Sequence, residues 1–156
     1  MNIDEMLEAV KKNANSDPLA AKLPKEVNLK AAKKVIYAVE SAAAKMGVRV
    51  VIAVVNGGAN LVALEAMDGS YIASIRVAQD KAYTAMALKM PTQKALEESR
   101  GGSLDGLTNG NGILLLGGGE PLVCGNEIVG AVGVSGGTKD EDMALAKIGA
   151  EVFRLS

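Results

Sequence analysis

The 156-residue sequence contains no histidine, no tryptophan and a single cysteine, Cys124. One cysteine cannot form an internal disulfide, and a chain without histidine lacks the ligand sets of the standard zinc sites. The absence of histidine also excludes Ser-His-Asp and Cys-His catalysis, so any acid–base chemistry falls to Asp, Glu, Lys or Tyr. We therefore predict no metal site, and composition alone identifies no catalytic residue.

Aromatic residues and net charge are also scarce. The chain has three Tyr and one Phe, and its 17 basic residues nearly balance its 18 acidic ones. It lacks the basic surface and the stacking platforms of a nucleic-acid binder. No segment approaches the roughly 20 apolar residues of a membrane span, and the acidic start lacks the basic region of a signal peptide. We expect a cytoplasmic protein that binds neither nucleic acid nor membrane.

The first 26 residues differ from the remainder. Ile3, Met6, Leu7 and Val10 recur at the spacing of one helix face, and a polar connector with two prolines follows. We divide the chain into an N-terminal amphipathic helix with its connector, residues 1–26, and one domain, residues 27–156. The helix either packs on its own domain or a neighbouring subunit, or it docks residues 1–23 on another protein.

Residues 27–156 alternate patterns typical of helices and strands. A run of strands placed between helices, instead of strict alternation, indicates an α+β domain with a single antiparallel sheet of about five strands covered by helices. We expect helices at residues 29–46, 71–90, 92–99 and 143–155, and strands at 48–55, 61–66, 113–116, 121–124 and 127–134. Thr138 and Glu141 match the capping box that starts the last helix.

Lys81 and Thr84 lie three residues apart on the long helix, so they share a face and could address one ligand. The apolar stripe of this helix is expected at Ile75, Ala78 and Ala82, among others, with Lys81 on its flank. The alternative is a solvated lysine, or one that pairs with a carboxylate such as Asp68. In either case an exposed Lys81 would contribute little to stability.

Two glycine clusters could cradle an anion, but their spacing argues against it. Residues 117–121 lack the Lys-Ser/Thr ending of a phosphate loop and lead into a strand. Residues 133–137 do precede a helix, yet three acidic residues in its first turn would repel an anion. Tight turns are the simpler interpretation of these glycines.

Five segments together resemble the GlcG/HbpS-like family, which includes the C-terminal domain of PduO-type proteins. They are the hairpin at 54–61, the Met67-Asp68-Gly69 turn, the run at 81–85, the loop at 118–121 and the strand and turn at 130–137. Asn56 departs from the usual Asp. The resemblance implies a profilin-like fold, homo-oligomers, and binding of haem or a role in corrinoid metabolism. The adenosyltransferase activity of PduO-type proteins belongs to an N-terminal domain that this chain lacks.

We therefore predict a small oligomeric ligand-binding or accessory protein for haem or a corrinoid-type tetrapyrrole. Histidine cannot be the axial ligand, which leaves Thr84, Tyr71, Tyr83, Met67 or Cys124. The alternatives are a metal-independent enzyme that uses Lys81, Asp68 or Glu120, and a microcompartment-associated protein that docks on a shell or partner enzyme through residues 1–23. The candidate ligand-binding residues are Met67, Asp68, Gly69, Lys81, Thr84, Arg100, Gly118, Gly119 and Glu120.

Overall fold

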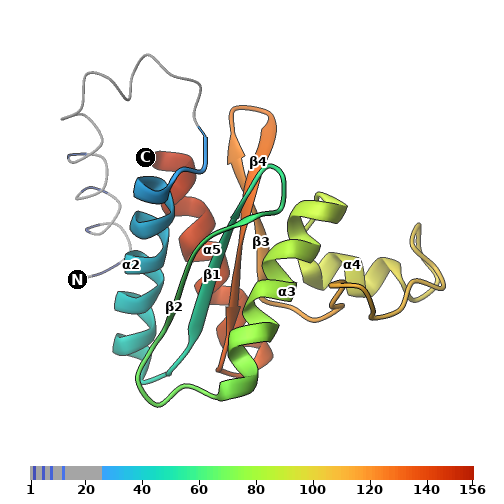
Figure 1. The fold of residues 1–156 in the computed structure, drawn as a ribbon, viewed down its shortest axis with the longest axis horizontal. Helices are drawn as coiled ribbons and strands as arrows, with labels where there is room; N and C mark the ends of the chain where they lie inside the picture. The colour runs from blue at the N-terminus through green and yellow to red at the C-terminus, as the bar shows by residue number, and fades with distance from the viewer. Residues whose placement is uncertain (1, 3–4, 6–7, 9–11, 13–25) are drawn as a thin grey trace.

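The computed structural model describes residues 2, 5, 8, 12 and 26–156. Its helices are α2 (Leu29–Met46), α3 (Ile72–Leu88), α4 (Thr92–Glu98) and α5 (Lys139–Leu155), and its strands are β1 (Val51–Asn56), β2 (Leu61–Ala66), β3 (Gly119–Cys124) and β4 (Glu127–Ser135). The strands form one antiparallel sheet in the order β2-β1-β4-β3 (Figure 1). The predicted α+β class and antiparallel sheet are confirmed.

Helices cover both faces of this sheet (Figure 1). Val50, Ile52 and Val54 pack with α2 and α5 on one face, while Val51, Ala53 and Val55 pack with α3 on the other. Because successive strand side chains alternate between faces, a strand covered on both sides needs apolar residues at every position. This explains why β1 is an uninterrupted apolar run.

Small residues bring α3 unusually close to β4. A Cβ atom added at Gly133 of β4 would lie 2.0 Å from the carbonyl oxygen of Ala78, so only glycine fits there. Ala78, Ala82 and Ala85 of α3 are fully buried against the sheet. The same buried face of α3 carries Ser74 and Lys81, whose side chains reach Ser135 and Val134 at the end of β4.

The prediction of about five strands was wrong, because the sheet that residues 26–156 form has four. Residues 113–116, expected to be a strand, contribute only an isolated bridge between Gly110 and Ile113. Their backbone donors are bound elsewhere: Leu114 N–H donates to Thr84 Oγ1 at 2.8 Å, and Leu115 N–H donates to Asn109 Oδ1 at 2.8 Å. Side chains thus hold this segment as a loop, which runs from α4 to β3.

Most of the predicted N-terminal helix lies outside the described residues, including Ile3, Met6, Leu7 and Val10. Its described start has a reciprocal cap. Glu5 N–H donates to Asn2 Oδ1 at 2.8 Å, and Asn2 N–H donates to Glu5 Oε2 at 3.1 Å. Such a cap satisfies backbone donors that the first helical turn leaves free.

Candidate functional site

Lys81 is among the largest side chains that the fold buries completely, with 1% of its surface exposed. The expectation that it lies on the flank of its helix was wrong. The buried stripe of α3 is rotated toward Ser74 and Lys81, and Ile75, expected inside, is 41% exposed. A charged group at this depth needs both an ion-pair partner and hydrogen bonds to be tolerated.

Asp142 is that partner, and the suggested pairing with Asp68 is wrong. Lys81 Nζ donates to Asp142 Oδ2 at 2.9 Å and to the carbonyl oxygen of Val134 at 2.9 Å. Asp142 belongs to the first turn of α5, which Thr138 and Glu141 start with the predicted capping box. Its other oxygen accepts from Gly137 N–H at 2.8 Å. The protein thus places its own carboxylate where a helix N-terminus would otherwise attract an anion.

The electrostatics of the pair reflect its depth. Burial lowers the pKa of the Lys81 ammonium, and the charge and hydrogen bond of Asp142 oppose that shift. Burial likewise raises the pKa of the Asp142 carboxyl, opposed by Lys81 and by the amides of Gly137 and Gly136. A desolvated amine is one requirement of a Schiff-base lysine. Such a lysine also needs an amine that is free to attack a carbonyl, whereas Lys81 Nζ is held by Asp142 and by the carbonyl oxygen of Val134.

Two glycines of the predicted site lie directly over Lys81. Gly118 has a φ of +120°, and a Cβ there would lie 2.8 Å from Lys81 Nζ and 2.8 Å from the carbonyl oxygen of Val134. A Cβ at Gly119 would lie 2.5 Å from the carbonyl oxygen of Lys81, and its N–H donates to Thr92 Oγ1 at 2.9 Å. These glycines let the backbone close over the ion pair.

Thr84 lies one turn beyond Lys81 and is fully buried. Its hydroxyl donates to the carbonyl oxygen of Asp80 at 2.7 Å, lies 3.2 Å from that of Gly112, and accepts from Leu114 N–H at 2.8 Å. The hydroxyl is therefore used within the protein. In this structure Thr84 anchors the loop before β3 to α3.

A cavity of about 300 Å³ opens beside the ion pair, between the start of α3, the start of α5 and the loop before β3. Its wall contains Ser74 and Ser135, whose hydroxyl oxygens are 3.0 Å apart in a buried hydrogen bond. Other lining residues are Tyr71, Val77, Lys81, Leu116, Lys139 and Asp142. The cavity therefore combines an apolar side with polar groups of both signs, as small-molecule sites commonly do.

The remaining predicted residues do not line this cavity. Asp68 and Gly69 are exposed in a turn closed by the bond from Ser70 N–H to Met67 O, and Met67 itself packs against the core of the α2 side. Arg100 is exposed just after α4. Among the predicted site residues the structure thus brings together Lys81, Gly118 and Gly119, with Thr84 one helical turn away.

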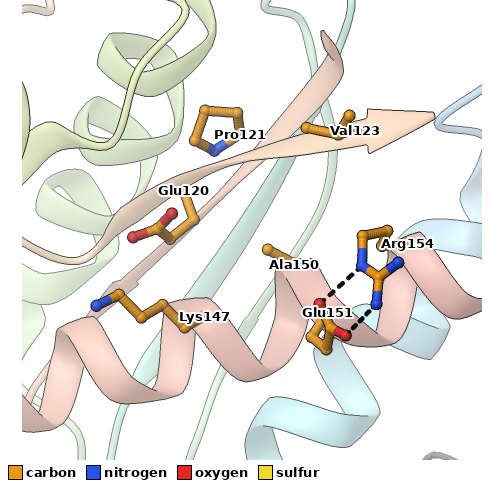
Figure 2. Close-up of a pocket in the computed structure, with 7 residues that line it drawn as sticks. All are labelled: Glu120, Pro121, Val123, Lys147, Ala150, Glu151 and Arg154. Carbon is orange, nitrogen blue, oxygen red and sulfur yellow. Dashed lines mark hydrogen bonds and ion pairs between the residues drawn. The ribbon is translucent and has the colours of Figure 1, made fainter. Parts of the chain in front are cut away.

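Glu120 lies on the opposite face of the sheet from Lys81. It pairs with Val132, whose side chain belongs to the core shared with α5, whereas Gly119 pairs with Gly133 beneath α3. Figure 2 shows Glu120 beside Lys147 of α5. The three groups expected to act in acid–base catalysis are thus separated: Lys81 is held in the buried ion pair with Asp142, Asp68 is in an exposed turn, and Glu120 is across the sheet.

The model of the family named "Haem degrading protein HbpS-like" matches residues 27–151 of this chain. The chain belongs to the HbpS-like family. A protein of Citrobacter freundii, called "Uncharacterized 15.0 kDa protein in dhaT-dhaS intergenic region", is 39% identical over 130 residues, which are 81% of this chain and 92% of that protein. Most of the HbpS-like chain therefore has a counterpart in this relative.

Solved structures share the fold. The crystal structure of the Klebsiella pneumoniae protein ORFY matches with a TM-score of 0.77 and 36% identity, over 85% of this chain and 93% of that one. The crystal structure of a PduOC:heme complex matches with a TM-score of 0.76 over 82% of this chain and 95% of that one. Its identity is 24%, so it supports the fold alone.

Sequence reasoning missed Asp142, the serine pair and Lys139 as site residues. The position of Asp142 could have been found from the sequence. Asp142 shares the i, i+3, i+4, i+7 spacing of the buried stripe formed by Leu145, Ala146 and Gly149. An acidic residue in such a stripe indicates a buried partner as well as a favourable helix-end charge.

Proposed function

We propose that this HbpS-like protein is a small ligand-binding accessory protein that holds haem, or a related planar tetrapyrrole, at the cavity between α3 and α5. The family, whose description names haem, supports this choice of ligand. A corrinoid remains the alternative of the same class. The profilin-like arrangement and an oligomeric state, both implied by the family resemblance, are part of this proposal.

The mouth of the cavity is the observation that carries the proposal. Tyr71 and Leu116 line it and are 71% and 38% exposed, and Ile72, beside Tyr71, is 89% exposed. Exposed apolar groups gathered at a cavity mark a binding surface. Lys139, also in the lining, is exposed and can bind a carboxylate of the ligand. An apolar face flanked by a cation fits a tetrapyrrole with acidic side chains.

Tyr71 is the residue at this cavity that would hold haem iron, a role that tyrosine has in catalases. The hydroxyl of Thr84 is already bound inside the protein, and Tyr83, Met67 and Cys124 do not line the cavity. When bound, haem would supply iron chemistry at the surface. The protein's own groups would bind and orient it through Tyr71, Leu116 and Lys139.

Haemin titration followed by visible absorption tests the proposal. We expect a shifted Soret band without bis-imidazole character, because the chain has no histidine. Tyr71→Ala should weaken binding and Tyr71→Phe should change the spectrum, whereas Tyr37→Phe, on the exposed face of α2, should change neither. Hydroxocobalamin serves as the corrinoid probe. Failure of both pigments to bind in a defined ratio would overturn the proposal.

We further propose that residues 1–23 dock this protein on a partner enzyme or a microcompartment shell. The family match begins only at residue 27, and the cap between Asn2 and Glu5 supports a separate helix start. Deletion of residues 1–23 should leave the cooperative unfolding of the domain intact and abolish co-purification with the partner. If the deletion costs several kcal/mol or makes the chain insoluble, this segment belongs to the fold.

A further inference from the structure

A second cavity, of about 230 Å³, lies between β3 and α5, on the face of the sheet opposite Lys81 (Figure 2). Glu120 lines it from the strand and Lys147 from the helix, with Pro121, Val123 and Ala150 as apolar neighbours. A Glu151–Arg154 ion pair on α5 borders it, with Arg154 Nε donating to Glu151 Oε2 at 2.9 Å. This groove is separate from the proposed tetrapyrrole site.

Glu120 and Lys147 face the groove without partners of their own. Within residues 26–156, neither side chain forms a hydrogen bond or an ion pair, so their charged atoms lie farther apart than the roughly 4 Å of a salt bridge. Figure 2 shows the carboxylate and the ammonium directed toward the same space. Burial raises the pKa of Glu120, and the charge of Lys147 only partly opposes this shift. The carboxylate is thus partly desolvated without a hydrogen-bond donor.

The free edge of β3 is closed to an added peptide strand. Gly119 N–H points away from β4 and donates to Thr92 Oγ1, and Pro121, two residues on and on the same edge, has no N–H. A peptide that extended the sheet would find no free amide donor at either position. The groove therefore suits a small molecule better than a polypeptide.

We propose that this groove binds a small zwitterion of the amino-acid type, whose ammonium group pairs with Glu120 and whose carboxylate pairs with Lys147. A simple anion at Lys147 would be repelled by Glu120, and a simple cation at Glu120 would be repelled by Lys147. A neutral polyol could reach both groups but would form weaker hydrogen bonds than two charge-assisted ones. The zwitterion alone satisfies both charges.

Titration of the 15N-labelled protein with glycine, acetate and methylammonium tests this proposal by chemical-shift changes. Glycine should shift the amide signals of Val123 and Ala150 and saturate, whereas acetate and methylammonium at equal concentration should bind roughly tenfold more weakly or not at all, since each meets only one partner. Equal binding of acetate, or no saturable shift with glycine, would overturn the assignment.

Variants at the two charges complete the test. Glu120→Gln and Lys147→Gln should each weaken glycine binding roughly tenfold or more, because each removes one charge-assisted hydrogen bond. Glu127→Gln, at the exposed start of β4, and Lys94→Gln on α4 are matched controls and should bind as the unmodified protein does. Lys147 is exposed, so its variant stays informative should Glu120→Gln fail to fold. Unchanged glycine binding by folded Lys147→Gln would refute the proposal.

Discussion

Lys81 and Asp142 place opposite charges in the core, and the contribution of each depends on the other. Removing one member of a buried pair leaves the other without a counter-charge, which typically costs about 3–5 kcal/mol. This reasoning replaces the expectation of a lysine that contributes little to stability. The side chains are 1% and 6% exposed, so solvent screens them little.

We predict that Lys81→Met lowers the free energy of unfolding by about 3–5 kcal/mol in urea denaturation. Lys81→Met combined with Asp142→Asn should recover much of that loss, because no buried charge then remains and the Asn oxygen can still accept from Gly137 N–H. Lys94→Met, at an exposed position of α4, is the control and should change stability by about 0.5 kcal/mol or less. A small loss in the single variant would show that Lys81 reaches solvent.

The carboxyl groups of Glu40 on α2 and Glu65 on the edge strand β2 form a hydrogen bond. Burial, followed by the hydrogen bond and the charge of Glu65, raises the pKa of Glu40 to about 7 from an ordinary value of 4.5. Between about pH 4.5 and pH 7, Glu40 therefore keeps a proton in the folded state that it has already released in the unfolded state. The resulting stabilisation is complete below about pH 4.5 and is lost as the pH rises through about 7.

Glu40→Gln should remove this pH dependence. Thermal unfolding of the unmodified protein should show a contribution that declines between about pH 4.5 and pH 7, and the variant should have a flatter profile there. Glu127→Gln, at the exposed start of β4, controls for the loss of a negative charge. Parallel profiles for the Glu40 variant and the unmodified protein would mean that the two carboxyl groups do not share a proton.

At the scale of the whole molecule, large apolar side chains remain on the surface around the start of α3. Ile72 is 89% exposed, Tyr71 71% and Ile75 41%. Apolar patches of this kind commonly mark contacts between subunits. No helix of the described residues is long and apolar enough to cross a membrane.

We predict that the protein is a homo-oligomer, which sedimentation equilibrium at micromolar concentration should detect as a mass above 16.0 kDa. Ile72→Lys should shift the distribution toward smaller species, because it places a charge in the apolar patch. Lys94→Gln, on α4, should leave the distribution unchanged. A monomer in the unmodified protein would contradict the prediction.

The sequence by itself determined the local helices and strands, and it excluded histidine as an iron ligand. Helix and strand periods are properties of neighbouring residues, so α2, α3, the β1–β2 hairpin and the capping box of Thr138 and Glu141 were all predictable. The lack of histidine determined that no imidazole can bind iron. The motifs at 67–69, 81–85 and 130–137 indicated the family, which the match over residues 27–151 confirms.

Only the tertiary structure decided which of these residues meet. Lys81 and Asp142 are 61 positions apart, and their pairing depends on α3 and α5 converging at the end of β4. Glu120 could not be assigned to a face, because a shift of one residue in strand register reverses every side chain. The expected strand at residues 113–116 was also decided by contacts between distant parts of the chain. Its donors bind Thr84 and Asn109, and no local pattern shows which acceptors a folded chain will supply.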